Sequence, residues 1–548
     1  MRRRILLFTT SLILATTLYA QDHQRIPSEK PRLVIGIVVE QMRFDYIYRF
    51  WDKFGDGGFK RLINEGTFCS NARYNYMFTQ TSPGYATIMT GSNPSTHGIV
   101  SDEWYVRLKD RKVSSTWDQD ANPIGGSYED GHHSPKNLVA STFTDELSLA
   151  TNFKSKIVGI GTFPEAAVFG AGHTASEAYW YDPVTGTWMS SSYYMETLPD
   201  WVKTFNEKKL ADTYLDRTWE PLLPPDQYTE GLADTNKYET GLEGQNHFPY
   251  DLKAMSTISR KKRNYALLTS TPFSINLTKD FAIDAIIEDS LGMDKYTDVL
   301  QIGFASPGII SKEFGLTSVE LMDAYLRLDA ELAHFLSFID DHLGKENVLV
   351  YLTSDHGISQ IPAYMKDVRI PAGYFNYNQA TALLISYLNI VYGHGNWIKS
   401  YDNQQIYLNR QLIEDSKIPL EEIQNTVARF LLQFTGVANT VTSTTLSEID
   451  FTRGIFEQMQ NSFNQNRSGD VMINLEPGWI EKTEYATKNN SPYNYDTHVP
   501  LIWYGWKIKR SEINEPVSMT GIAPTLSSLL RISFPNAASG KPIISLLR

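Results

Sequence analysis

Two apolar segments, VLQIGF at residues 299–304 and NVLVYLTSDHG at residues 347–357, decide the fold. Each begins as a short, uninterrupted run with β-branched residues, the pattern of a strand buried on both faces. After the first run we expect a loop, followed by a long amphipathic helix from residue 318 to about residue 343. The order strand, helix, strand is that of a βαβ unit, so the sequence predicts a parallel sheet.

A third buried strand is predicted at Leu33–Val39 (LVIGIVV), and it ends at Glu40. A short helix is expected at residues 84–91 (GYATIMTG), preceded by a polar turn at residues 79–83. A late strand is expected at residues 499–504 and a late helix at residues 521–530. Functional groups in open parallel sheets gather at the carboxyl ends of the strands. Glu40, the loop after Phe304, and the pair Asp355 and His356 all take such positions, which indicates one site built from distant segments.

The length and composition bound the architecture. A chain of 548 residues with 42% hydrophobic and 20% charged residues is globular and long enough for a large core with insertions. Residues 175–290 and 358–490 lack the strand and helix rhythm of the rest. We interpret them as cap-like insertions over the sheet, within one α/β domain spanning residues 21–548.

The first 20 residues have the pattern of a secretory signal peptide. Arginines at positions 2, 3 and 4 are followed by an apolar run at residues 5–19 and by Ala20. A membrane anchor is the alternative interpretation, but the run is short for a bilayer span. We expect an exported protein, located in the periplasm, secreted or at the cell surface, with no transmembrane segment after cleavage.

Charge and cysteine content exclude two classes of function. Removal of the signal peptide takes away three arginines and no acidic residue, so the formal net charge goes from −12 to −15. Such an acidic chain argues against nucleic acid as a partner, because phosphate backbones require lysine and arginine. Cys69 is the single cysteine of the sequence, which rules out an internal disulfide and a thiolate metal cluster. Any metal must therefore bind to oxygen and imidazole ligands.

The residues that carry candidate chemistry are Glu40, Thr81, Asp355, His356 and His498. Carboxylates and imidazoles are ligands for a divalent ion, and a hydroxyl beside such an ion can act as a nucleophile. Taken without the motif around it, Thr81 would be interpreted as a helix cap, and the strand end at Asp355 could be an ordinary turn. Three further histidines, at positions 97, 173 and 394, sit beside glycines in expected loops, and we interpret them as structural.

Five motifs in the same order resemble those of the alkaline phosphatase superfamily: VVEQMRFDY at 38–46, TSPGYATIMTGSNPSTHGI at 81–99, TSDHG at 353–357, THVPLIWYG at 497–505 and GIAPTLSSLL at 521–530. The sequence is most similar to the bacterial alkaline phosphatases with a threonine nucleophile, which are related to the nucleotide pyrophosphatase/phosphodiesterases. The resemblance covers most of the mature chain. It implies a mostly parallel central sheet flanked by helices, with cap insertions, and metal-dependent hydrolysis of small phosphate esters.

The same resemblance assigns roles to four residues. Thr81 matches the nucleophile, and Asp355 and His356 match two ligands of one zinc site. Glu40 stands where the family has aspartate, which keeps the carboxylate and adds one methylene. These side chains, with the Thr81 hydroxyl, imply one divalent metal ion, either zinc or else calcium or magnesium.

The second metal site of the family is not retained. Its aspartate and histidine positions correspond to Gly308 and Lys312, and of its three ligands His498 alone remains. A zinc site normally uses three or four protein ligands, and a lysine would repel the ion, so we expect no second metal. In the related single-metal sulfatases a lysine supplies charge near this place, and Lys312 is a candidate for that role. A sulfatase itself is not expected, because Thr81 cannot form the aldehyde that those enzymes use.

Three positions that bind phosphate in the family have also changed. Asp102 stands where the monoesterases have asparagine, and Phe163 and Glu165 stand where they have lysine and arginine. Asp102 and Glu165 would each oppose the binding of a phosphate dianion. The sequence therefore leaves two hypotheses: a phosphoesterase with one eroded metal site that attacks mono- or diesters through Thr81, or a catalytically inactive pseudophosphatase that acts as a binding or scaffold protein of the cell envelope. The oligomeric state is not predicted.

Overall fold

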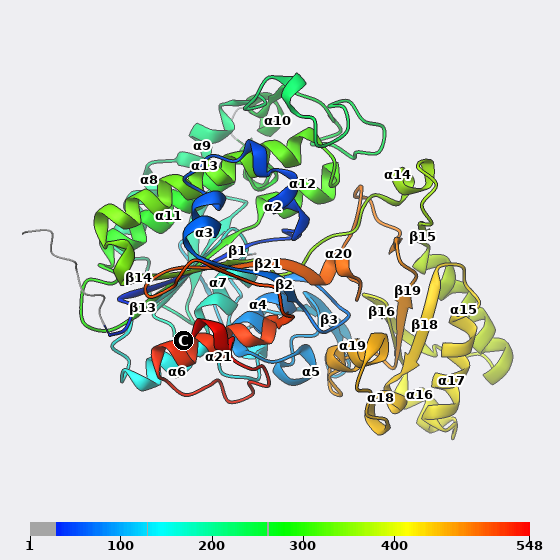
Figure 1. Ribbon diagram of the computed structural model, residues 1–548. Helices are drawn as coiled ribbons and strands as arrows, with labels where there is room; N and C mark the ends of the chain where they lie inside the picture. The colour runs from blue at the N-terminus through cyan, green and yellow to red at the C-terminus, as the bar shows by residue number, and fades with distance from the viewer. Residues whose placement is uncertain (1–28, 129, 260–261, 548) are drawn as a thin grey trace, which may run out of the picture.

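The centre of the molecule is one eleven-stranded sheet, seen nearly edge-on in Figure 1. The computed structural model describes residues 29–128, 130–259 and 262–547, so the expected signal peptide at residues 1–20 lies outside the described residues. Along the sheet the order is β22 (Ser511–Ile513), β2 (Thr67–Arg73), β21 (His498–Gly505), β14 (Val348–Thr353), β1 (Leu33–Val39), β13 (Asp298–Phe304), β6 (Ile157–Gly161), β7 (Glu177–Asp182), β8 (Thr187–Ser191) and β5 (Pro123–Ile124), with β23 (Val517–Ser518) beside β2.

Strand β1 lies inside the parallel part of this sheet, which runs β14-β1-β13-β6-β7. It pairs in parallel with β13 on one side and with β14 on the other, and β6 and β7 continue the parallel order beyond β13. Every residue of β1 is buried. Leu33, Ile35 and Ile37 face one core while Val34 and Val38 face the other, which explains the uninterrupted apolar run.

Helices cover both faces of the sheet (Figure 1). One core contains side chains of α3 (Phe59–Glu65), α11 (Phe273–Glu288) and α13 (Val319–His342). The other contains side chains of α4 (Thr81–Thr90), α7 (Pro164–Ala171) and α21 (Ile522–Leu530). The predicted α/β class with a mostly parallel central sheet flanked by helices is confirmed. The sheet is not wholly parallel, because β21 runs antiparallel to both β14 and β2.

Two local predictions differ from the structure. The stretch after Phe304, expected to be a loop, contains the helix α12 (Ser306–Phe314), which has a proline in its first turn and ends at Gly315, where φ is +83°. The helix expected at 84–91 begins three residues earlier, at Thr81, inside the segment expected to be a turn. Thr81 is therefore a residue of the first helical turn.

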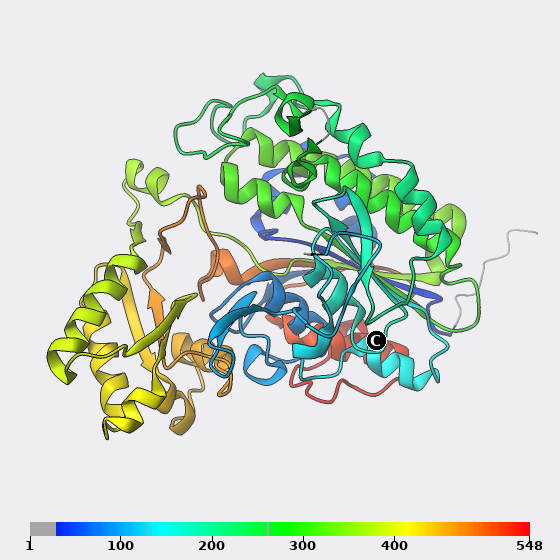
Figure 2. The same cartoon turned by 180° about the vertical axis from the view of Figure 1, so that it is seen from behind.

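A second lobe lies beside the main body, drawn in yellow and orange in Figure 1 and seen from behind in Figure 2. It contains the antiparallel sheet β16-β17-β19-β18, formed by β16 (Ile398–Asp402), β17 (Gln405–Leu408), β19 (Val471–Leu475) and β18 (Val437–Thr442). The helices α15 (Tyr377–Tyr392), α16 (Arg410–Asp415) and α17 (Leu420–Leu431) pack on it and form a separate hydrophobic core. This lobe makes up most of the 358–490 segment.

The segment 175–290 has a different place in the fold. Its first two strands, β7 and β8, extend the main sheet, and α11 packs against the sheet. Whether either segment acts as a cap over a substrate stays a prediction. Within the described ranges, which leave out residues 1–28, we find no helix with the length and apolar character needed to cross a membrane.

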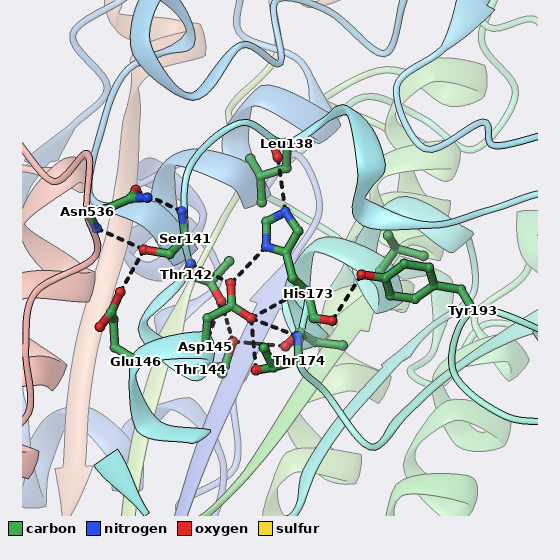
Figure 3. Close-up of polar contacts among 12 residues, drawn as sticks. Leu138, Ser141, Thr142, Thr144, Asp145, Glu146, His173, Thr174, Tyr193 and Asn536 are labelled. Atoms are coloured by element: carbon green, nitrogen blue, oxygen red, sulfur yellow. Dashed lines mark hydrogen bonds and ion pairs between the residues drawn. The ribbon is translucent and has the colours of Figure 1, made fainter. Parts of the chain in front are cut away.

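His173 has a structural environment, shown in Figure 3. Its Nδ1 lies 2.8 Å from Oδ2 of Asp145, and its Nε2 lies 3.0 Å from the carbonyl oxygen of Leu138. Asp145 also accepts hydrogen bonds from the backbone N–H groups of His173 and Thr174 and, together with Thr142, forms the capping box of α6 (Phe143–Ala150). The imidazole thus ties the end of α7 to the start of α6.

Candidate active site

The carboxyl ends of three adjacent strands bring distant residues together. Glu40 follows β1, Asp355 and His356 follow β14, and α12 begins directly after β13. A pocket of about 430 Å³ opens at this edge and is lined by Glu40 and by Thr81 at the start of α4. The structure therefore groups the segments in which the sequence placed the candidate chemistry.

Helix α4 approaches the end of β14 very closely. A Cβ atom on Gly84 would lie 2.4 Å from the carbonyl oxygen and 2.8 Å from the Cα of Asp355, distances that real side chains do not show. Glycine is therefore required one helical turn after Thr81. This contact fixes where the Thr81 hydroxyl lies relative to the carboxylates of the pocket.

The two carboxylates of the site each have an oxygen without a partner. Oδ1 of Asp355 accepts hydrogen bonds of 2.8 Å from the backbone N–H groups of Gln41 and His356. Oδ2 of Asp355 and Oε1 of Glu40 are buried and have no hydrogen-bond partner among the described residues. Unpaired buried carboxylate oxygens are costly, and oxygen of this kind is the ligand that hard divalent cations take.

The electrostatics of Glu40 reflect the same arrangement. Burial, and then the Asp355 carboxylate, raise the pKa of Glu40 well above its ordinary value, while the nearby Lys312 acts in the opposite direction. Like charges that are buried together disfavour the ionised form unless a cation lies between them. The pair Glu40 and Asp355 therefore fits a bound cation better than it fits two free carboxylates.

The imidazole of His356 is held in place by polar neighbours. Its Nδ1 donates to the carbonyl oxygen of Gly357 at 2.6 Å, and its Nε2 accepts from the side-chain amide of Asn489 at 3.3 Å. The same Nε2 lies 3.4 Å from Oδ2 of Asp355. A hydrogen bond at one ring nitrogen fixes the tautomer and leaves the other nitrogen with a lone pair.

His498 does not join this group. Its Nε2 lies 3.0 Å from the carbonyl oxygen of Ser70, and its ring stacks on Phe44 with the ring centroids 4.1 Å apart. Burial lowers the pKa of His498. Among the described residues, no three histidine, cysteine, aspartate or glutamate side chains form a cluster able to hold a metal ion. A cation at Glu40 and Asp355 would thus take further ligands from the Thr81 hydroxyl and from water.

Most of the positions that depart from the family pattern line the same pocket. Asp102, Phe163, Glu165 and Lys312 all face it, and Lys312 is the one cationic side chain among the described residues of the lining. Burial, and then Asp102, raise the pKa of Glu165 to about 7. A carboxylate also occupies the N-terminus of α4, because the backbone N–H of Ser82 donates to Oδ1 of Asp102 at 2.8 Å.

Gly308 lies beneath a glutamine that sequence reasoning missed. A Cβ on Gly308 would lie 3.1 Å from Nε2 of Gln41 and 3.2 Å from the carbonyl oxygen of Glu40, so the Gln41 side chain fills the space there. The hydroxyl of Ser311 donates to Oε1 of Gln41 at 3.2 Å. A signal for this role was present, since Gln41 directly follows Glu40 at the end of β1.

Glu313 and Tyr485 also line the pocket, and sequence reasoning missed them too. Burial, and next Glu484, raise the pKa of Glu313 to about 7. Tyr485 comes from the segment that returns from the second lobe to the main body, and no motif marks it.

A family model, described as type I phosphodiesterase / nucleotide pyrophosphatase, matches residues 34–500. The chain belongs to this family. It is therefore a member of a family of phosphoester hydrolases within the alkaline phosphatase superfamily, and the resemblance inferred from the five motifs is confirmed.

Several known proteins are similar over nearly the whole chain. Alkaline phosphatase PafA of Elizabethkingia meningoseptica is 38% identical over 541 residues, which cover 98% of each chain. Alkaline phosphatase PhoV of Synechococcus elongatus is 36% identical over 521 residues, or 95% of this chain and 93% of PhoV. The crystal structure of wild-type PafA superposes with a TM-score of 0.90 and 38% identity and covers 95% of this chain and 99% of that one.

Proposed function

We propose that the chain is an exported phosphoesterase that attacks its substrate through Thr81, with one divalent cation between Glu40 and Asp355. The observation that carries the proposal is the pair of buried, unpartnered oxygens, Oε1 of Glu40 and Oδ2 of Asp355, beside a pocket that Thr81 lines. A cation there would favour the alkoxide form of the Thr81 hydroxyl. The donors placed there are oxygen atoms of Glu40, Asp355 and Thr81, a set that suits magnesium or calcium.

The chemistry of the chain's own residues is a double displacement. The Thr81 Oγ forms a bond to phosphorus as the ester P–O bond breaks, and the leaving alcohol takes a proton. Water then hydrolyses the phosphothreonine and restores the hydroxyl. Lys312 supplies positive charge to the phosphoryl oxygens, since it lies close enough to Glu40 to lower the pKa of that carboxyl against the effect of burial.

The charge of the pocket favours a phosphodiester as the substrate. A monoester dianion would meet Asp102 and Glu165 with Lys312 as its one cationic partner among the described lining residues. A diester carries one negative charge less, so the repulsion from each carboxylate is about halved. The lining also offers Phe163 and Ile309 as apolar surface for the second ester group.

The proposed location rests on the N-terminal sequence. The basic start, the apolar run at 5–19 and Ala20 favour export to the periplasm, with secretion or surface attachment as alternatives. Tagging the full-length chain at its C-terminus and fractionating cells, with N-terminal sequencing of the exported form, tests this. An N-terminus at or near Gln21 is expected, and an uncleaved chain in the cytoplasm would refute export.

The inactive alternative is favoured by a specific observation. The start of α4 already hydrogen-bonds to a carboxylate, Asp102, and within the described residues no cluster of three metal-binding side chains is present. In that case the pocket would bind a ligand without turning it over. This pseudophosphatase would act as a binding or scaffold protein of the cell envelope.

One experiment separates the two functions. Purified chain stripped with a chelator is assayed on p-nitrophenyl phosphate and on bis(p-nitrophenyl) phosphate with zinc, magnesium or calcium added. We expect cation-dependent turnover, faster on the diester, that Thr81→Ala abolishes and Thr81→Ser retains in part. Elemental analysis should give at most one ion per chain. Turnover at background with all three cations would leave the pseudophosphatase as the function, and equal turnover by Thr81→Ala would refute attack through Thr81.

A further inference from the structure

A second cleft, of about 820 Å³, lies between the main body and the second lobe, and none of its described lining residues is shared with the Thr81 pocket. One wall is the hairpin of β3 (Glu103–Val106) and β4 (Arg111–Ser114), which Figure 1 shows on the side of the body that faces the lobe. The other wall is formed by the start of α15, the end of β16 and the residues that follow β20 (Trp479–Glu481). A molecule bound here would touch both parts of the chain.

The lining has an unusual composition. Among the described residues, every side chain that lines the cleft is charged, amide, hydroxyl or tyrosine, and none is aliphatic. Four carboxylates face three lysines, so the net charge is close to zero. A lipid or apolar peptide would lose hydrogen bonds there without gaining apolar contact, and a polyanion would find no excess of positive charge.

The apolar surface that the cleft does offer is a pair of stacked tyrosines. The rings of Tyr377 and Tyr401 are 5.0 Å apart between centroids and inclined by 10°. The Tyr401 hydroxyl donates to Oε1 of Glu481 at 2.5 Å, which fixes the inner ring. A rigid aromatic platform beside polar groups is suited to a ligand that has one less polar face and many hydroxyls.

The floor of the cleft consists of buried charged groups that are held in place. Nζ of Lys488 lies 2.5 Å from Oε2 of Glu481, a residue that is 3% exposed. Burial alone would raise the pKa of Glu481, but Lys488 and the Tyr401 hydroxyl lower it, so this carboxylate is ionised and well supported. Fixed hydrogen-bonding groups of this kind give specificity because they lose little freedom when a ligand binds.

Asp402 supplies an acceptor that the protein itself does not satisfy. Nζ of Lys112, on the hairpin, lies 2.8 Å from Oδ1 of Asp402. Oδ2 is buried and has no hydrogen-bond partner among the described residues. Asp402 is 6% exposed and lines the cleft, and a small rotation of its side chain would turn Oδ2 toward a hydroxyl of a bound molecule, which would relieve this cost.

We propose that the cleft between the β3–β4 hairpin and the second lobe is a binding site for a neutral saccharide, whose ring packs on Tyr377 and whose hydroxyls bond to Asp402, Glu481 and the neighbouring amides. The cleft has its own lining, which borders that of the Thr81 pocket at Glu103 and Glu484, and binding there does not require turnover at Thr81. It would let the protein attach to, or sense, a glycan outside the cell.

The test is a titration of the full mature chain with glucose, galactose, mannose and N-acetylglucosamine and with their common disaccharides, followed by saturation-transfer NMR and thermal shift. At least one sugar should bind saturably with a Kd of about 1 mM or tighter. Tyr377→Ala should raise the Kd for that sugar by about tenfold or more, whereas Tyr377→Phe, which keeps the ring, should have a Kd within about twofold of the wild-type value. Asp402→Asn should also weaken binding.

Controls separate loss of binding from loss of fold. Each variant is compared with Tyr128→Ala, which removes a tyrosine that is 69% exposed and outside the cleft, and each must unfold cooperatively near the wild-type temperature. Any of three results would overturn the proposal. Wild type binds no saccharide saturably, or Tyr377→Ala binds the sugar as tightly as wild type does. The third is that wild type binds inorganic phosphate saturably and binds none of the sugars.

Discussion

The backbone N–H of Ser82 donates a 2.8 Å hydrogen bond to Oδ1 of Asp102 at the first turn of α4. The N-terminus of a helix attracts anions, and here a carboxylate of the chain itself already takes that place. Asp102 is supported in turn by Gln80, whose Oε1 accepts the backbone N–H of Asp102 at 2.8 Å. A phosphoryl group approaching Thr81 must therefore bind next to a fixed negative charge.

Asp102→Asn should improve the use of phosphate monoesters. The asparagine Oδ1 can still accept from Ser82, so the geometry is kept while one negative charge is removed. Two like charges 4 Å apart cost up to about 4 kcal/mol at an effective dielectric of 20, and water in the pocket reduces this. We expect kcat/KM for p-nitrophenyl phosphate to rise by about tenfold, and inorganic phosphate to inhibit at lower concentration.

The matched control for this variant is Asp200→Asn, which removes an equal charge from a side chain that is 99% exposed. It should leave unchanged both kcat/KM for p-nitrophenyl phosphate and the inhibition constant of inorganic phosphate. If Asp102→Asn leaves the inhibition constant of phosphate at its wild-type value, the carboxylate does not act on the bound anion.

Much of this arrangement follows from the sequence, for a physical reason. A strand buried on both faces must be apolar throughout, so β1, β13 and β14 could be recognised, and parallel pairing then places Glu40 and Asp355 at one edge. The start of α4 was predicted too late because Pro83 and Gly84 suggest a turn, although Pro is well suited to a first helical turn. The role of Tyr485 could not be predicted, because its place depends on how a distant lobe returns to the sheet.

Glu40→Gln should separate two effects of the buried carboxylate pair: its cost to stability without a cation, and the stability gained when a cation binds. Without divalent cation the variant should be more stable than wild type, since burial and Asp355 both disfavour the ionised Glu40. With cation present at a hundred times its Kd, wild type should gain about 2.7 kcal/mol and the variant much less. Urea unfolding with chelator and with each cation measures both differences. Glu448→Gln, on an exposed helix end, is the control. An equal gain in wild type and Glu40→Gln would contradict the assignment of Glu40 as a ligand.

Gly84→Ala should destabilise the chain and impair catalysis together. The added Cβ would lie 2.4 Å from the carbonyl oxygen of Asp355, and this neighbour is backbone that cannot rotate away. Forcing extra volume into such a contact typically costs about 1–3 kcal/mol, and it would move α4 and Thr81 away from β14. Gly55→Ala is the control, because its Cβ would lie at an ordinary 3.4 Å from Asp329. If Gly84→Ala keeps the unfolding free energy and the turnover of wild type, the contact between α4 and Asp355 does not position Thr81.

The pair formed by Asp145 and His173 (Figure 3) should make stability depend on pH. Burial alone would lower the pKa of His173, but the hydrogen bond and charge of Asp145 outweigh it and raise the pKa above the ordinary 6.5. The pKa of Asp145 lies below the ordinary 3.8, because His173 and the backbone N–H groups of Thr142 and Thr174 outweigh its burial. The histidine contribution is fully present below pH 6.5 and is lost as the pH rises through the raised pKa. The aspartate contribution is present above pH 3.8 and is lost as the pH falls through the lowered pKa.

Between these limits the pair stabilises the junction of α6 and α7 most. We therefore expect the difference in unfolding free energy between wild type and His173→Asn to be largest from about pH 4 to about pH 6.5 and to shrink as the pH rises above 6.5 through the raised pKa. Asparagine can still donate to Asp145 but cannot titrate, so the variant removes the pH-dependent part and leaves the capping box of α6 in place. Urea unfolding across this range measures the difference, and an NMR titration of the His173 ring gives the pKa directly. A difference that stays constant with pH, or a His173 pKa at or below 6.5, would show that the carboxylate does not outweigh the burial of the ring.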